Sequence, residues 1–220
     1  MRQLSRDLYI CLAAVTGCAS ITLSAAGVAA ALTKHVRVFA RNGNIVIDQD
    51  GHAVQVTQDE KDSEPALSPD GSTIVFVRET SGEKISTGSG DASANSLWLV
   101  KADGTGARRL AASHDSEKVE NILAGLTVPQ FAPNGRSVYF LSSAWAVSDA
   151  AHMVDLATGK ERFICDANSL RIIQHGKRRG YLVVSKHKYR GEEGSYDWYW
   201  LVSPSGKEIR TLGETDTAPQ

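Results

Sequence analysis

The chain has 220 residues, of which 42% are hydrophobic and 22% are charged, and its formal net charge is −1. This length suits one ordinary domain or two small ones, and the apolar content is sufficient for a packed core. The balance of 24 basic and 25 acidic residues lacks the basic excess typical of nucleic-acid-binding proteins. We therefore expect a globular protein without a nucleic-acid partner.

Residues 1–33 form a targeting segment with a composition of its own. Two arginines precede an apolar run over residues 8–32, a pattern typical of an export signal. Three fates stay open. Cys18 ends a lipobox-like Val-Thr-Gly-Cys stretch and would then carry a lipid, the small residues at 28–30 suit an ordinary signal peptidase, or the uncut run is long enough to anchor the chain in a membrane. All three predict export, to the periplasm or the envelope, and two of them tether the N-terminus to a membrane.

A turn-and-strand phrase occurs twice in the body of the chain. SPDGSTIVFV begins at Ser68, and APNGRSVYFL begins at Ala132. In both, a Pro-Asp-Gly or Pro-Asn-Gly turn leads into a short apolar strand, and these turn residues tolerate the backbone angles that a tight turn needs. The phrase therefore predicts the first hairpin of a repeated unit.

A second phrase occurs four times, as an apolar strand, a polar turn with glycine and another short strand. The turn glycines are Gly51, Gly104, Gly159 and Gly206. Aligning them places Ile45, Trp98, Met153 and Trp200 at one position. This shared position predicts that Trp98 and Trp200 pack between repeats.

The two phrases in succession describe a four-stranded antiparallel sheet of roughly fifty residues. A single sheet of this kind cannot cover both of its faces, so the units must stack on one another. Radial stacking gives a β-propeller, which also hides most strand edges.

The sequence EPALSPDGSTIVFVRE, followed by SLWLVKADGTGARRL, resembles the repeat of the TolB-type β-propellers. That repeat reads P-x-[FW]-S-P-D-G-x-x-[IL]-x-[FY] and then L-[WY]-[VL]-x-x-x-D-G. The match is strong over residues 64–110, fair over 129–165 and weaker over 170–212, where GKRRGYLVVS replaces the Pro-Asp-Gly turn. The resemblance implies a propeller and, commonly, a periplasmic location. It implies no catalytic residues, because the repeat is a folding motif. TolB proteins also have an N-terminal domain and six blades, neither of which this sequence shows.

We predict an all-β fold over residues 34–214, a partial or small β-propeller of about 3.5–4 four-stranded antiparallel blades. The expected units are a half blade at 36–57, blades at 64–110 and 129–165, a degenerate blade at 170–212, and a tail at 215–220 that could begin another blade. So few blades leave three interpretations: an unusually small ring, an open arc completed by a second copy or another protein, or a fragmentary gene product.

The sequence contains no G-x-S-x-G, H-E-x-x-H, C-x-x-C or phosphate-binding glycine motif, so we assign no catalytic, cofactor-binding or metal-binding residue. Cys165 lies in the apolar stretch ERFICDA, and we expect a plain core residue without a disulfide. Aspartate and asparagine before a turn glycine accept hydrogen bonds from their own backbone. We therefore assign a structural turn role to Asp70, Gly71, Asn134, Gly135, Asp103, Gly104, Gly159 and Gly206.

Two segments depart from the repeat. The stretch 79–95 is rich in glycine and serine, and we expect a mobile loop there. The stretch 171–190 is basic without any acidic residue, and the aromatic strand SYDWYW follows it. We predict a partner-binding surface for an anionic envelope component there, with a solvated hairpin as the alternative. Its candidate residues are Arg171, Lys177, Arg178, Arg179, Lys186, Lys188, Arg190 and Trp198.

These features predict an exported, non-catalytic propeller that acts as a protein-binding or scaffold module of the bacterial cell envelope. Its partner would be an envelope protein or a second copy of itself. Two alternatives stay open: a propeller-type hydrolase or lyase, or the remnant of one, and a periplasmic inhibitor or small-ligand sensor.

Overall fold

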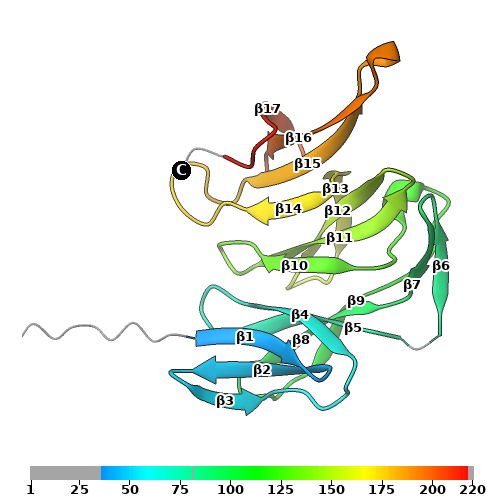
Figure 1. Cartoon of the computed structure of the whole chain (residues 1–220). Helices are drawn as coiled ribbons and strands as arrows, with labels where there is room; N and C mark the ends of the chain where they lie inside the picture. Colours follow the sequence, from blue (N-terminus) through cyan, green and yellow to red (C-terminus); the bar gives the residue numbers. More distant parts are fainter. Residues whose placement is uncertain (1–35, 81, 218–220) are drawn as a thin grey trace, which may run out of the picture. The chain divides into compact units, whose positions relative to one another are not determined.

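The computed structural model describes residues 36–80 and 82–217, which belong to one compact unit (Figure 1). The expected targeting segment, including Cys18, lies outside the described residues. Over the described part the chain is all-β, with strands β1 to β17 and two short 3-10 turns, η1 (Val119–Asn121) and η2 (Gly191–Glu193). No helix among these residues has the length and apolar character needed to cross a membrane.

Four antiparallel sheets, numbered here in chain order, carry most of the strands. Sheet 1 consists of β1 (Val36–Arg41), β2 (Asn44–Gln49) and β3 (His52–Gln55). Sheet 2 consists of β4 (Asp62–Leu67), β5 (Thr73–Arg78), β8 (Ser96–Lys101) and β9 (Arg108–Ala112). Sheet 3 consists of β10 (Thr127–Phe131), β11 (Ser137–Trp145), β12 (Ser148–Asp155) and β13 (Glu161–Asp166). Sheet 4 consists of β14 (Ser169–Ile172), β15 (Leu182–Tyr189), β16 (Ser195–Val202) and β17 (Glu208–Gly213).

The two copies of the turn-and-strand phrase form the same hairpin. In sheet 2, the Ser68 N–H donates to the Thr73 carbonyl at 2.8 Å, and the Gly71 N–H donates to the Ser68 carbonyl at 2.9 Å. In sheet 3, the equivalent bonds, Ala132 to Ser137 and Gly135 to Ala132, are both 2.8 Å long. The repeated turn sequence therefore starts each unit with the same backbone geometry.

Hydrophobic clusters hold neighbouring sheets together. Between sheets 1 and 2 lie Ile45, Ile74, Phe76 and Val100, with Trp98 against them. Between sheets 2 and 3 lie Val75, Val77, Leu97, Leu99, Val138, Phe140 and Val154. Between sheets 3 and 4 lie Tyr139, Leu141, Ile164, Cys165, Leu182 and Val184, with Trp200 against them.

Alternation along each strand explains these clusters. Successive side chains point to opposite faces, so β5 sends Ile74 and Phe76 toward sheet 1 and Val75 and Val77 toward sheet 3. Complete burial of one such side chain stabilises the fold by about 1.5–3 kcal/mol. The predicted packing of Trp98 and Trp200 between repeats is confirmed.

Two segments differ from the expectations drawn from sequence. The expected half blade at 36–57 contains three strands, because the Asn42-Gly43 turn allows β1 to pair with β2. The stretch 79–95 is not simply a loop, since it contains the hairpin of β6 (Lys84–Thr87) and β7 (Gly90–Ser93). This hairpin is attached to sheet 3, where the Gly88 N–H donates to the Ala144 carbonyl at 2.6 Å.

Candidate binding site

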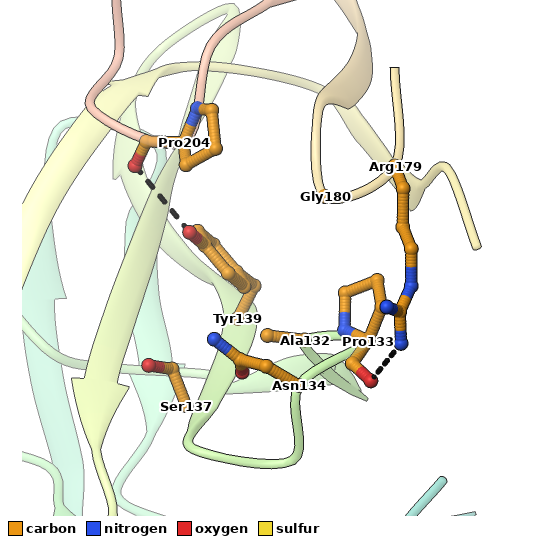
Figure 2. A pocket seen from close by; sticks show the side chains of 8 residues that line it. All are labelled: Ala132, Pro133, Asn134, Ser137, Tyr139, Arg179, Gly180 and Pro204. Atoms are coloured by element: carbon orange, nitrogen blue, oxygen red, sulfur yellow. Dashed lines mark hydrogen bonds between the residues drawn. The ribbon is translucent and has the colours of Figure 1, made fainter. Parts of the chain in front are cut away.

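A pocket of about 260 Å³ lies between sheets 3 and 4 (Figure 2). Sheet 3 provides one wall from the turn between β10 and β11 and from the start of β11. Sheet 4 provides the other wall from the turn before β15 and the turn after β16. The lining residues are Ala132, Pro133, Asn134, Ser137, Tyr139, Arg179, Gly180 and Pro204.

The polar groups of this pocket join its two walls. The Tyr139 hydroxyl donates to the Pro204 carbonyl at 3.3 Å, and Arg162 donates to the same carbonyl at 3.0 Å. Arg179 donates to the Pro133 carbonyl at 2.7 Å, as Figure 2 shows. Burial raises the pKa of Tyr139 although the Arg162 charge opposes that rise, so the phenol stays neutral and acts as a donor. The site is suited to holding two sheets together rather than to proton transfer.

Polar side chains on the first strands of the sheets also form contacts between sheets. The Glu64 carboxylate of β4 accepts the Val128 N–H of β10 at 2.5 Å. The Gln130 amide of β10 donates to the Leu170 carbonyl at 2.7 Å, and its oxygen accepts the Ile172 N–H at 3.2 Å. These groups therefore bind neighbouring backbone and help to align the sheets.

Strands β15 and β16 extend past the rest of sheet 4 as a two-stranded ribbon, which we define as residues 186–198. β14 pairs only with residues 182–185, and β17 pairs only with residues 199–202. The pairs from Lys186–Trp198 to Tyr189–Ser195 therefore have no flanking strand. In Figure 1 the tip of this ribbon extends well beyond the other strands of the sheet.

The end of the ribbon carries aromatic and cationic side chains in contact. The Arg190 guanidinium lies 4.5 Å from the centre of the Tyr196 ring and 5.2 Å from that of Trp198. The two rings meet edge to face at 4.8 Å. Tyr189 is 68% exposed. Such cation–π contacts hold an arginine against the aromatic rings, so the side chains at this end of the ribbon have a fixed arrangement.

The structure does not gather the basic residues of 171–190 into one surface. Lys177, Arg178 and Arg179 lie in the turn before β15, whereas Lys188 and Arg190 lie at its far end. At about 3.3 Å per residue, the eight-residue β15 separates these groups by about 23 Å. Arg178 lies over the Tyr181 ring, and Arg171 is ion-paired with Asp216. The predicted single patch is thus divided between two ends of the strand.

Lys186 is a correction to the predicted binding surface. Its side chain is only 2% exposed, and its Nζ donates to Asp166 at 2.9 Å and to Glu208 at 2.8 Å. Burial alone lowers the pKa of Lys186, but the hydrogen bonds to these two carboxylates outweigh burial and raise it. Lys186 therefore stays charged inside the protein and binds no external partner.

The structure places the predicted turn residues in tight turns. The five turn glycines have φ values between 68° and 92°: Gly71, Gly104, Gly135, Gly159 and Gly206. The Asp70 carboxylate accepts the Ser68 hydroxyl at 2.6 Å and the Ser72 N–H at 3.0 Å. These hydrogen bonds lower the pKa of Asp70 to about 2, and bonds from Thr105 lower the pKa of Asp103. Asn134 accepts the Arg136 N–H at 2.9 Å in the same manner as Asp70.

Sequence reasoning missed a buried histidine. His152 is fully buried, stacks on Phe140 with ring centres 5.5 Å apart, and contacts Glu161 through Nδ1 at 2.5 Å. Its Nε2 has no hydrogen-bond partner. Its position in an alternating strand predicts burial on one face, but only the pairing of β12 with β13 reveals Glu161.

Cys165 and His187 both lie in the described part of the chain. Cys165 is buried, and burial raises the pKa of its thiol to about 11, in agreement with the expected core role. Across 36–80 and 82–217, no three histidine, cysteine, aspartate or glutamate side chains cluster as metal ligands. His187 and Asp197 lie opposite each other on the two strands of the ribbon and are in contact at 2.9 Å.

No model of a known protein family matches the sequence, and no curated protein matches it. Solved structures do match. Dipeptidyl peptidase 4 of Porphyromonas gingivalis superimposes with a TM-score of 0.55 at 14% identity, over 80% of this chain and 31% of that one. TolB of Acinetobacter baumannii gives 0.53 at 12% identity, over 80% and 39%. An oligogalacturonate lyase in complex with manganese gives 0.52 at 16% identity, over 76% and 41%.

These similarities establish the fold. The chain is an all-β protein whose described residues form three four-stranded antiparallel sheets and one three-stranded sheet, arranged as blades of the β-propeller type. It spans well under half the length of each of these three proteins. These three proteins include a peptidase and a lyase as well as TolB, and one fold hosts many activities. The function of this chain must therefore be argued from its side chains.

Proposed function

We propose that the chain is an exported, non-catalytic binding module of the cell envelope and that it holds a macromolecular partner through the end of the ribbon. The observation that most supports this proposal is the ribbon of two strands that extends beyond its sheet. At its end, an exposed Tyr189 lies beside Arg190, which lies over two aromatic rings. Tyrosine, tryptophan and arginine are the residues that most often dominate protein interfaces.

The polar groups of the blades support binding over catalysis. Glu64 and Gln130 on the first strands bind the backbone of the next sheet. The carboxylates with lowered pKa values, such as Asp70 and Asp155, accept hydrogen bonds within their own turns. A general acid or base needs a pKa near the working pH and a path to substrate, whereas these groups are engaged in holding the fold.

The proposed location rests on the sequence of the first 33 residues and on the TolB-like repeat. A module exported in this way would meet envelope proteins first. The ribbon carries Lys188 and Arg190 beside Glu192 and Asp197, so its charge is mixed. This mixture favours a protein partner with polar and aromatic contacts over a uniformly anionic polymer.

Capture of partners from envelope extracts tests the proposal. The bait is the full chain, and the test variant is Tyr189→Ala with Arg190→Ala. The matched control is Lys177→Ala with Arg178→Ala, which removes two exposed side chains at the opposite end of β15. We expect a stoichiometric partner that the wild type and the control retain, and that the ribbon variant binds about tenfold more weakly or worse, a loss of about 1.4 kcal/mol or more.

Two outcomes would contradict this function. One is equal capture by the ribbon variant and the wild type, which would place the partner elsewhere. The other is turnover of a glycan or peptide library by the purified chain, which would favour the hydrolase or lyase alternative.

A further inference from the structure

Sheet 1 has one strand fewer than the other three sheets. The turn glycine Gly51 between β2 and β3 corresponds to Gly104, Gly159 and Gly206 between the last two strands of sheets 2, 3 and 4. β1 therefore corresponds to the second strands β5, β11 and β15. Among the described residues, no strand of sheet 1 occupies the first-strand position that β4, β10 and β14 fill in the other sheets.

The missing strand leaves β1 less covered than its equivalents. Among the described strands, β1 is hydrogen-bonded to β2 alone. The four central residues of β5 are all buried, whereas no residue of β1 is buried. A strand edge with unpaired N–H and C=O groups is a template on which another strand can add.

The first strands of sheets 2 to 4 contact one another in chain order, and the segment after β17 continues this series. Glu64 of β4 binds β10, and Gln130 of β10 binds β14. In turn, Arg171 of β14 donates from Nε to the Asp216 carboxylate at 2.9 Å and from Nη2 to the Asp216 carbonyl at 3.0 Å. Asp216 thus lies against β14 on the side where the first strand of a following sheet would lie.

The sequence of this segment resembles those of the first strands β4 and β10. β4 contains Ser63-Glu64-Pro65, and β10 contains Thr127-Val128-Pro129-Gln130. Residues 217–220 read Thr-Ala-Pro-Gln and match β10 at three of four positions. The residue before proline has a positive φ in both strands, 47° at Glu64 and 52° at Val128. At this proline motif the pairing of each first strand with the second strand of its sheet shifts register.

We propose that residues 214–220 of one copy add to the free edge of β1 in a second copy and complete its sheet 1. Within one chain Asp216 lies beside β14, and Figure 1 shows β17 and β1 in the sheets at opposite ends of the series. Reciprocal exchange creates two identical contacts, which is the closed arrangement of a two-fold dimer. Two copies would contribute about eight sheets, within the usual range of about four to eight for propellers.

Disulfide trapping between two different chains tests this pairing. One full-length chain carries Gln220→Cys and a differently tagged full-length chain carries a cysteine at Val38, Phe39 or Ala40, scanned singly because the register is free. Directly opposed residues of antiparallel strands have Cα atoms about 4.5–5.5 Å apart, which suits a disulfide. Any link between position 220 and β1 in this mixture must join two copies, and peptide mapping separates it from the native cysteines.

The proposal predicts a disulfide between position 220 and at least one β1 position in the mixed sample. A matched control places the cysteine at Val54 of β3, which is 60% exposed but lies at the other edge of sheet 1 and should not link. The proposal is overturned if no β1 position links in the mixture, or if a chain that carries both cysteines links only within itself. Circular dichroism of each variant confirms that the strands remain folded.

Discussion

At the scale of single residues, polar side chains in the turns set the backbone for the hairpins. The Asp70 carboxylate accepts bonds from the Ser68 hydroxyl, the Ser72 N–H and the Ser72 hydroxyl at 2.6, 3.0 and 2.8 Å. These bonds favour the ionised carboxylate and lower the pKa of Asp70 from 3.8 to about 2. The stabilisation therefore depends on the charge of this group.

Replacement of Asp70 should separate charge from hydrogen bonding. Asp70→Ala loses every acceptor and should lower the urea midpoint at pH 7. Asp70→Asn should lower it less, because Asn134 already fills the equivalent position of the next hairpin.

The pH dependence of this effect follows from the lowered pKa. A depressed carboxyl pKa stabilises the fold fully above the ordinary value of 3.8, and this stabilisation is lost as the pH falls toward about 2. The difference in midpoint between wild type and Asp70→Asn should therefore shrink between pH 5 and pH 2. A constant difference over that range would show that the Asp70 charge does not stabilise the turn.

At the scale of elements, close approaches between sheets make some turns far more demanding than others. Gly206, in the turn between β16 and β17, has a φ of 92°, and a Cβ there would lie 2.2 Å from the Ile164 carbonyl oxygen of sheet 3. Gly159, in the equivalent turn of sheet 3, has a φ of 68° with open space around the added atom. The two glycines share a sequence role but differ in their surroundings.

Alanine substitution at these two glycines should give unequal losses of stability. Gly159→Ala should lower the free energy of unfolding by about 1–2 kcal/mol, because alanine is strained in the left-handed backbone region. Gly206→Ala should cause the same backbone strain and also force sheets 3 and 4 apart, which lowers the free energy of unfolding by about 1–3 kcal/mol more. Chemical denaturation measures both values, and equal losses would contradict the close packing of this turn against β13.

The sequence predicts local elements well and contacts between distant elements poorly. Asp-Gly and Asn-Gly turns predict their hairpins, because the required backbone angles are properties of the turn residues themselves. The burial of Lys186 depends on Asp166 and Glu208, which are 20 and 22 residues away. Likewise, the sequence offers Arg171 as a candidate partner-binding residue, and its ion-pair partner Asp216 is 45 residues away. Only the folded arrangement brings such groups together.

The same limit applies to the candidate binding surface. The sequence places an aromatic strand beside a basic stretch, and the structure pairs them as the hairpin of β15 and β16, while the binding role of Arg190 and Trp198 stays a prediction. The alternation of residues along a strand could not show that β15 and β16 extend beyond β14 and β17. Whether a strand is flanked along its whole length depends on where the neighbouring strands end. The ribbon is therefore a finding of the structure.

At the scale of the whole molecule, the series of sheets is held together by apolar clusters between neighbours and by polar contacts between first strands. Every clustered interface joins two consecutive sheets. An array of this kind gains stability from each neighbour, and an unpaired end is where another chain can add. Sheet 1, whose β1 is hydrogen-bonded to β2 alone among the described strands, provides that end.

The mass of the full-length chain in solution tests the central claim, that a second copy completes sheet 1. Light scattering coupled to size exclusion should give twice the mass of one chain for the wild type, and the mass of a single chain after removal of residues 214–220. Circular dichroism should show that the shortened chain keeps its strands, since β17, the last described strand of sheet 4, ends at Gly213. A single-chain mass for the wild type, or a two-chain mass that survives removal of the segment, would contradict the account.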